Sequence, residues 1–212
     1  MTPQAIRTAL LLDGGRDDDP TLALVHQALA ETLAAGGWHV DGWLLRDEPI
    51  AWCAGCFGCW VKTPGVCVHT DAGREVAARV ARSDLLVYLT PVTFGGYSSE
   101  LKKALDHVIP ILLPDLRKSG RDTRHPQRYR RAHDLLAVGT VPAGEAAGAE
   151  ALTFRRLVGR NALNVCPNHW AAGVVEVGSD DREVRRAVAA LLGQIGVDTG
   201  PLATPAALEV TA

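Results

Sequence analysis

Four of the five cysteines in this 212-residue chain lie within fifteen residues of one another, at Cys53, Cys56, Cys59 and Cys67. The first three follow at intervals of three, which suits a cuboidal iron–sulfur cluster in which each thiolate binds a different iron corner. Zinc fits less well, because its sites usually take two cysteine pairs separated by a longer spacer. The spacing therefore indicates a [4Fe-4S] cluster, with a loop of free, packed thiols as the alternative. Cys166 stands apart and is expected to be a small buried side chain, or else an alternative fourth ligand.

A second segment with a chemical pattern runs from Leu89 to Asp106, from an apolar run through a loop into a helical pattern. Because Gly95 and Gly96 lack side chains, the backbone amides of this loop can approach a planar ring closely. Amides near the nitrogens and oxygen of a flavin ring stabilise its reduced, anionic form. We therefore expect a flavin site here, with a plain strand-to-helix connection as the alternative. The loop residues are Pro91, Val92, Thr93, Phe94, Gly95, Gly96, Tyr97 and Ser98.

Short apolar runs alternate with amphipathic segments along the rest of the chain. Strands are predicted at 5–12, 38–45, 84–90, 134–140 and 173–177, and helices at 21–35, 71–81, 99–109, 150–163 and 181–195. Asp71 and Ser98 are the expected N-caps of the second and third helices. Such alternation favours parallel βαβ units with right-handed crossovers. The prediction is an α/β fold of three layers, a doubly wound, flavodoxin-like parallel sheet of five strands in the order 2-1-3-4-5.

The predicted sheet topology also indicates where a ligand would bind. Doubly wound sheets bind ligands beyond the carboxyl ends of their strands, at the switch point beside the first strand. The loops of interest are therefore 13–21, 46–70, 91–98 and 141–149. We expect one domain over residues 1–196, with a cysteine-rich loop at 46–70, a polar insertion at 114–133, and a separate C-terminal tail at 197–212.

Composition excludes several classes of protein. No apolar run approaches the ~18 residues that a membrane-spanning helix needs, and the first residues do not resemble a secretory signal. The formal net charge of −2 gives no electrostatic reason to expect a nucleic acid partner. We expect a cytoplasmic protein, in which clustered cysteines serve as metal ligands or redox groups.

Together, the cysteine pattern and the loop at 91–98 resemble the flavodoxin-like NAD(P)H-dependent FMN reductases, specifically their iron–sulfur flavoprotein branch. In that branch a compact CxxCxxC…C motif follows the second strand. A proline-containing loop ending in Ser-x-x-Leu-Lys-x-x-x-Asp follows the third strand and lies along the flavin ring. The resemblance spans roughly residues 5–178 and implies that the four clustered cysteines hold the cluster. It also implies that residues 91–98 hold FMN and that Gly139 and Thr140 present further backbone to the ring.

The loop after the first strand departs from the pattern of this family, whose members commonly hold the FMN phosphate with Gly-Ser-x-Arg and a later Ser or Thr. Here residues 13–21 read Asp-Gly-Gly-Arg-Asp-Asp-Asp-Pro-Thr. The resemblance assigns the phosphate to Gly14, Gly15, Arg16 and Thr21, where helix amides favour an anion. Three consecutive aspartates oppose a dianionic phosphate unless they point to solvent. A member that has lost its flavin is therefore the alternative.

The resulting functional prediction is an FMN-dependent oxidoreductase that is reduced by NAD(P)H and passes electrons through a cluster, or directly to a quinone, a flavin or another small acceptor. No side chain is assigned as a general acid or base, because flavin supplies the difficult chemistry. The resemblance also implies a homodimer or homotetramer that shares flavin sites between subunits. The alternative from a different class is a non-catalytic metal-binding or thiol protein on the same scaffold, without flavin.

Overall fold

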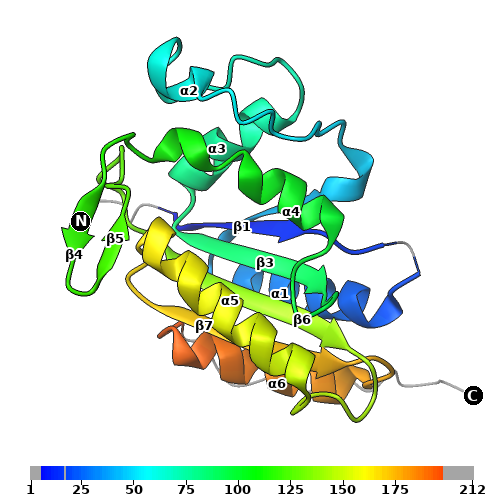
Figure 1. The fold of residues 1–212 in the computed structure, drawn as a ribbon. Coiled ribbons are helices and arrows are strands. Elements are labelled where there is room, and N and C mark those ends of the chain that lie inside the picture. The colour runs from blue at the N-terminus through cyan, green and yellow to red at the C-terminus, as the bar shows by residue number, and fades with distance from the viewer. Residues whose placement is uncertain (1–5, 17, 198–212) are drawn as a thin grey trace, which may run out of the picture.

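The computed structural model describes residues 6–16 and 18–197. A five-stranded sheet in the order β2-β1-β3-β6-β7 forms its centre, and every neighbouring pair is parallel (Figure 1). Counted within this sheet, the order is the predicted 2-1-3-4-5, so the predicted fold is confirmed. The strands are β1 (Thr8–Asp13), β2 (His39–Leu44), β3 (Leu85–Pro91), β6 (Asp134–Val141) and β7 (Trp170–Glu176).

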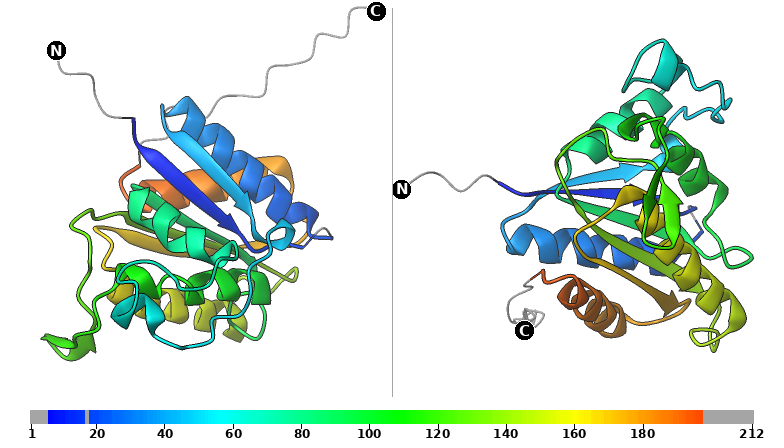
Figure 2. Two further views of the ribbon diagram at one scale, coloured as in Figure 1. Left: turned by 90° about the horizontal axis from the view of Figure 1, so that it is seen from above. Right: turned by 60° about the vertical axis from the view of Figure 1, so that its left-hand side comes forward.

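Helices cover both faces of the sheet, as the three-layer prediction requires (Figure 2). One face carries α1 (Pro20–Ala35) and α6 (Asp181–Gln194), which pack against each other. The opposite face carries α3 (Gly73–Arg82), α4 (Ser99–Asp106) and α5 (Ala149–Val165). Short helical segments lie between these elements, at η1 (Leu45–Asp47), α2 (Gly58–Val61) and η2 (Ile109–Ile111).

Strand alternation divides the apolar core into two clusters, one on each face of the sheet. In β1, Leu11 packs toward α1 and α6, whereas Leu10 and Leu12 pack toward the opposite helices. Strand β3 is buried along almost its whole length, which its uninterrupted apolar run predicts for a central parallel strand. The sheet therefore fixes the carboxyl ends of β1 and β3 next to each other, with little freedom to shift.

The second and third predicted helices differ most clearly from the structure at one end each. The second predicted helix begins at Gly73 with Ala72 as its N-cap, so the expected Asp71 cap is wrong; Asp71 Oδ2 instead accepts the Ala51 N–H at 2.7 Å. The third begins at Ser99, and Ser98 Oγ accepts the Leu101 N–H at 3.2 Å, which confirms the Ser98 cap. It ends at Asp106 rather than at residue 109, where a short 3₁₀ turn follows.

The polar insertion at 114–133 contains a two-stranded hairpin that the sequence does not reveal. Its strands, β4 (Arg117–Ser119) and β5 (Asp122–Arg124), pair antiparallel through a turn with Gly120 at φ 61°. Each strand has three mainly polar residues, too few to show an alternating pattern. Of the predicted tail, residues 198–212 lie outside the described residues. Within 6–16 and 18–197, none of the helices has the length and apolar character needed to cross a membrane.

Candidate functional site

A cavity of about 760 Å³ opens at the carboxyl ends of the central strands, between the loops that follow β1 and β3. Its volume lies in the usual range for small-molecule sites. The chain leaves β1 toward β2 at one side of the sheet and leaves β3 toward β6 at the other, so this is the switch point of the fold. We call it the carboxyl-edge cavity. Its lining residues are Gly15, Arg16, Asp18, Arg46, Pro91, Thr93, Ser98, Ser99, Glu100 and Lys103.

Five predicted flavin-binding residues, from two separate loops, line this cavity: Gly15, Arg16, Pro91, Thr93 and Ser98. Arg46 and Lys103 were not predicted from the sequence. They add two cationic side chains to that of Arg16, whereas Asp18 and Glu100 add acidic ones. Lys103 Nζ pairs with Glu100 Oε2 at 2.7 Å.

Ser98 and Gly14 join the two loops directly. Ser98 Oγ donates to the Gly14 carbonyl at 2.7 Å, although the two residues are 84 positions apart. The Gly14 N–H in turn donates to the Leu89 carbonyl at 2.8 Å. A Cβ at Gly14 would lie only 2.6 Å from the Leu101 Cβ. Gly14 is therefore required for this close approach and does not itself line the cavity.

A buried carboxylate holds the start of the loop after β1. Asp13 is 4% exposed, and its Oδ1 accepts the Gly15 N–H at 2.7 Å. Its Oδ2 lies 2.6 Å from Nδ1 of His26, which reaches across from α1. Neither residue was predicted to have a role. The available signal was an acidic residue at the end of a buried strand, and a buried carboxylate needs partners.

Asp19 occupies the N-terminus of α1, where the sequence places the FMN phosphate. Its Oδ1 accepts the Leu22 N–H at 2.9 Å, and its Oδ2 accepts the Thr140 hydroxyl at 2.7 Å. The Thr21 hydroxyl instead accepts the Gly178 N–H at 3.0 Å, on the side of the β7–α6 connection. Asp18 is exposed, and Asp17 lies outside the described residues. An anion at this helix end would therefore meet the carboxylate of Asp19.

The tip of the loop after β3 is a tight turn fixed by backbone hydrogen bonds. Thr93 and Gly96 exchange two of these bonds, at 3.1 and 2.8 Å, and Val92 N–H donates to the Thr140 carbonyl at 2.9 Å. Phe94 has φ 50° and is 91% exposed, and Gly95 has φ 73°. Glu150 at the start of α5 accepts the Gly95 N–H at 3.3 Å. The tip therefore has a defined shape before any ligand binds.

Three further predicted flavin residues, Tyr97, Gly139 and Thr140, support the loops around the cavity from the protein interior. Tyr97 turns inward, its ring packs edge-on against Tyr88 and Phe154, and burial raises its pKa to about 12. A Cβ at Gly139 would lie 2.5 Å from Val92 Cγ2, so this glycine makes room for the flavin-loop valine. Thr140 is buried and bonds to Asp19. These residues position the loops but do not line the carboxyl-edge cavity.

All four clustered cysteines line one small pocket, together with His69, Asp106 and His107. Cys59 is buried, and burial raises the pKa of its thiol, with a further contribution from Cys67. Within the described residues, no three cysteine, histidine or acidic side chains are placed to hold a single metal ion. The thiolates of a cuboidal cluster need not converge on one point, because each binds a different iron.

The cysteine-rich loop is docked on the end of α4 by an indole and an imidazole. Trp60 Nε1 donates to the Ile109 and Leu112 carbonyls, at 3.1 and 3.0 Å. His107 is 3% exposed and its Nε2 lies 2.9 Å from the Ala51 carbonyl oxygen. The loop therefore extends away from the sheet beyond α3 and α4, as Figure 1 and the right view of Figure 2 show.

This docking separates the cysteine pocket from the carboxyl-edge cavity. The pocket is lined by residues at the C-terminal end of α4, and the cavity by residues at its N-terminal end. The sequence instead predicts that both lie at the same edge of the sheet. Helix α4 has eight residues, so its ends are about 12 Å apart. Cys166 does not join the pocket; its Sγ accepts from Arg124 Nη1 at 2.7 Å.

Comparisons with known proteins give the family of the chain and its relatives. The family model of the NADPH-dependent FMN reductases matches residues 10–175. An iron-sulfur flavoprotein of Methanocaldococcus jannaschii is 31% identical over 96 residues, which are 45% of this chain and 48% of that protein. An iron-sulfur flavoprotein of Archaeoglobus fulgidus is 28% identical over 83 residues, 39% of this chain and 37% of that protein. The matched segments thus cover half or less of each of these relatives.

Solved structures share the fold at low sequence identity. An NAD(P)H:quinone oxidoreductase from Methanothermobacter marburgensis superposes with a TM-score of 0.66 at 13% identity, over 90% of this chain and 98% of that one. An FMN-dependent NADH-azoreductase from Bacillus anthracis, in complex with FMN, gives 0.58 at 11% identity, over 86% and 94% of the two chains.

Proposed function

The chain belongs to the family of NADPH-dependent FMN reductases, and on this premise we propose that it is an oxidoreductase that holds FMN, is reduced by NAD(P)H and reduces a small molecule. The observation that carries the proposal is the carboxyl-edge cavity. It lies at the switch point of a doubly wound sheet, and residues from two predicted flavin loops line it.

The residues of this cavity fit FMN. Its volume suits a ring system of that size, and Pro91 and Thr93, which line the cavity, offer a surface for it. For the phosphate, Gly15 and Arg16 form the loop after β1, and Arg46 and Lys103 add positive charge. Because Asp19 caps α1, we place the phosphate against these cationic side chains and not on the helix amides. Bound FMN would supply hydride acceptance from a nicotinamide, and electron release singly or in pairs.

The side chains of the site position groups and need not transfer protons. Ser98 joins the two loops, Glu150 holds the Gly95 amide, and Asp13 with His26 holds the Gly15 amide. Tyr97 stays protonated near neutral pH, because burial raises the pKa of its hydroxyl to about 12. A framework held in this way before binding loses little freedom when a planar ring arrives.

We also propose that Cys53, Cys56, Cys59 and Cys67 hold a [4Fe-4S] cluster, which would add one-electron chemistry. What supports it is the donor set: four thiols on one loop line a common pocket. The position of that pocket across α4 favours a route in which electrons leave at a distance from the flavin, within the chain or across a contact between subunits. We propose a homodimer or homotetramer, for which exposed apolar residues such as Phe94 and Val61 offer contact surface.

One observation favours a second candidate function, a metal-binding or thiol protein without flavin. The carboxylate of Asp19 stands where this family is expected to hold a phosphate. The flavin loop, the cavity and the family match oppose that reading, so we place the flavin enzyme first.

The test is protein purified without oxygen, followed by an absorption spectrum, flavin release and iron analysis. We expect one FMN per chain, before or after reconstitution, and reduction of its absorption bands by NAD(P)H. Arg16→Gln should weaken FMN binding about tenfold, the loss of one charged hydrogen bond, and leave riboflavin binding unchanged. Arg130→Gln makes the same charge change at an exposed residue outside the cavity and should have no effect. If neither isolated nor reconstituted protein holds FMN, the flavin-free function replaces this proposal.

A further inference from the structure

We propose that a second cavity, between α4 and α5, binds a small neutral aromatic molecule that carries a carbonyl group together with an N–H or O–H donor. Its volume is about 360 Å³. We call it the interhelix cavity. It lies toward the C-terminal ends of both helices, near the β4–β5 hairpin (Figure 1). It shares no lining residue with the carboxyl-edge cavity, so the two sites are separate.

The unpaired hydroxyl of Tyr88 points to a ligand. Tyr88 is 2% exposed, lines the interhelix cavity, and has no hydrogen-bond partner for its hydroxyl among the described residues. Burial raises its pKa, so the hydroxyl remains protonated and can donate. The hydroxyl is therefore free to donate, and a ligand carbonyl in the cavity would accept its hydrogen bond.

Two carboxamides on α5 add further hydrogen-bonding capacity. Asn161 and Asn164 are three residues apart, so they share one face of the helix, and both line the cavity. Asn161 Nδ2 donates to the Tyr97 hydroxyl at 3.0 Å, which leaves its Oδ1 to accept from a ligand. The side chain of Asn164 makes no hydrogen bond within the described residues, so it can donate or accept. The ligand therefore needs a donor as well as a carbonyl.

The apolar walls and the paired charges of the cavity indicate that the ligand carries a ring and is neutral. Leu105, Val108, Leu112 and Val165 line it with apolar surface suited to a ring. The two formal charges at its edge, Lys102 and Asp106, pair with each other. His125 is held through Nδ1 by the carbonyls of Leu113 and Asp115. The cavity thus offers no unpaired charge to an ion, and a neutral molecule fits best.

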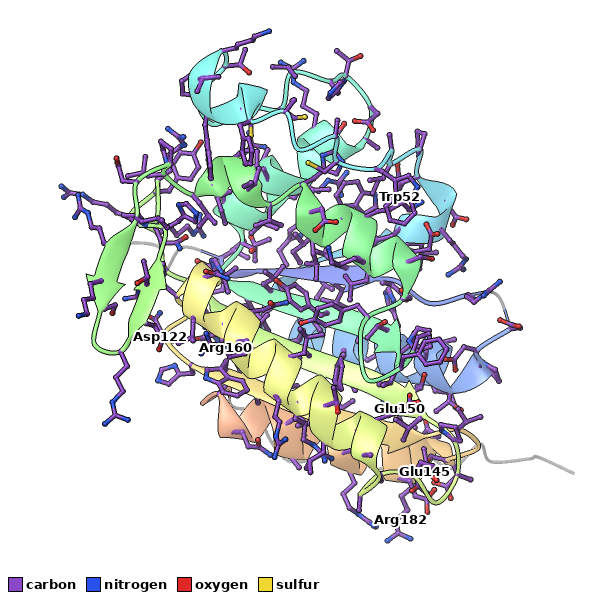
Figure 3. All side chains as sticks on the ribbon, viewed as in Figure 1. Trp52, Asp122, Glu145, Glu150, Arg160 and Arg182 are labelled. Atoms are coloured by element: carbon purple, nitrogen blue, oxygen red, sulfur yellow. The ribbon has the colours of Figure 1, made fainter. Side chains whose placement is uncertain are left out.

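The hairpin holds its side of the cavity in place. Figure 3 shows Asp122 of β5 beside Arg160 of α5, and their side chains pair at 3.1 Å. Trp60 packs on His125, with ring centroids 5.0 Å apart, and also bonds to the carbonyls of Ile109 and Leu112. Because Asp106 and Ile109 line both this cavity and the cysteine pocket, a ligand here would contact the support of the cysteine loop.

Benzamide is the probe that tests this proposal, because it combines a ring, a carbonyl and an N–H donor. We would titrate it into the protein as purified, with methyl-labelled leucine and valine residues followed by NMR. The methyl groups of Leu105, Val108, Leu112 and Val165 should shift together and give one dissociation constant. Tyr88→Phe removes only the unpartnered hydroxyl and should weaken binding five- to tenfold. Asn164→Leu should weaken it similarly.

Tyr129→Phe is the matched control, since it removes a tyrosine hydroxyl outside the cavity and should leave binding unchanged. Benzoate, with the same ring and a negative charge, should bind more weakly than benzamide. The proposal is overturned if the cavity methyl groups do not shift, if shifts are confined to residues around the carboxyl-edge cavity, or if Tyr88→Phe binds benzamide as well as the wild type does. Equal or tighter binding of benzoate would overturn the neutral class of ligand.

Discussion

Thr140 at the end of β6 donates its hydroxyl hydrogen bond to Asp19 at the start of α1, over 2.7 Å and 121 positions of sequence. The same carboxylate caps α1 through the Leu22 amide. Asp19 therefore ties the loop after β1 to the carboxyl edge of the sheet, and it also places a negative charge close to Gly15 and Arg16, to which we assign the phosphate. The structure gains a helix cap at a cost to anion binding.

Replacing Asp19 by Asn should tighten FMN binding. Asparagine caps helices about as well as aspartate, so α1 keeps its N-cap while the negative charge is removed. Two unit charges near a protein surface interact by about 1–4 kcal/mol at ~4 Å, so we expect at least a fivefold gain at low salt. The gain should shrink as salt is added. Fluorescence titration with FMN at two salt concentrations measures it.

Riboflavin is the ligand control for this change, because it lacks the phosphate and should bind wild type and Asp19→Asn equally. Asp18→Asn is the variant control: Asp18 is exposed, and its replacement should have the smaller effect. Unchanged FMN affinity in Asp19→Asn would show that the phosphate lies away from this carboxylate.

Ser98→Ala should destabilise the fold and weaken FMN binding together. It removes the cap of α4 and the hydrogen bond to the Gly14 carbonyl that joins the two cavity loops. Loss of an N-cap alone costs about 0.5–2 kcal/mol. Urea unfolding should therefore show a clear loss, compared with little for Ser99→Ala, whose hydroxyl is exposed. Equal unfolding midpoints for the two variants would contradict the linking role of Ser98.

Cys59→Ala should remove most of the iron and acid-labile sulfide while leaving FMN in place. A cluster needs all of its ligands, and the cysteine pocket and the carboxyl-edge cavity lie at opposite ends of α4. Cys166→Ala is the matched control, because its sulfur pairs with Arg124 outside the pocket. Iron, sulfide and flavin analysis of both variants provides the measurement. Wild type with flavin but no iron after reconstitution would exclude the cluster, and stoichiometric zinc without sulfide would make the site structural.

The free energy of unfolding should fall in mild acid, partly because unfolding lets His133 bind a proton. This residue is 5% exposed, its Nε2 has no partner among the described residues, and burial lowers its pKa, with Asp134 acting in the opposite direction. The unfolded chain, with a histidine pKa of about 6.5, then binds a proton that the folded protein does not. The folding stability linked to neutral His133 is therefore fully present above pH ~6.5 and is lost as the pH falls below that value.

His133→Gln should therefore lose less stability than wild type between pH 7.5 and 5.5, as measured by urea unfolding midpoints. His39→Gln changes an exposed histidine and should keep the wild-type pH dependence. Parallel behaviour of all three proteins would show that His133 does not contribute.

The sequence by itself determined the sheet and identified the two loops whose residues could bind a cofactor or a cluster. The apolar run of β3 and the alternating elements are local patterns, and they favour the observed strand order because right-handed crossovers between parallel strands leave few topologies. The Ser98 cap is equally local, since it depends on the chain turning into α4. The four cysteines are close in sequence, so no long-range contact is needed to bring them to one pocket.

Only the tertiary structure decided where those loops point. Trp60 bonds to carbonyls 49 and 52 positions away, and this contact carries the cysteine loop to the far end of α4 instead of the flavin edge. Asp19 turns toward Thr140, and Tyr97 turns into the core. The direction of a loop depends on contacts with residues distant in sequence. Those contacts cannot be inferred from residue type and spacing along one segment.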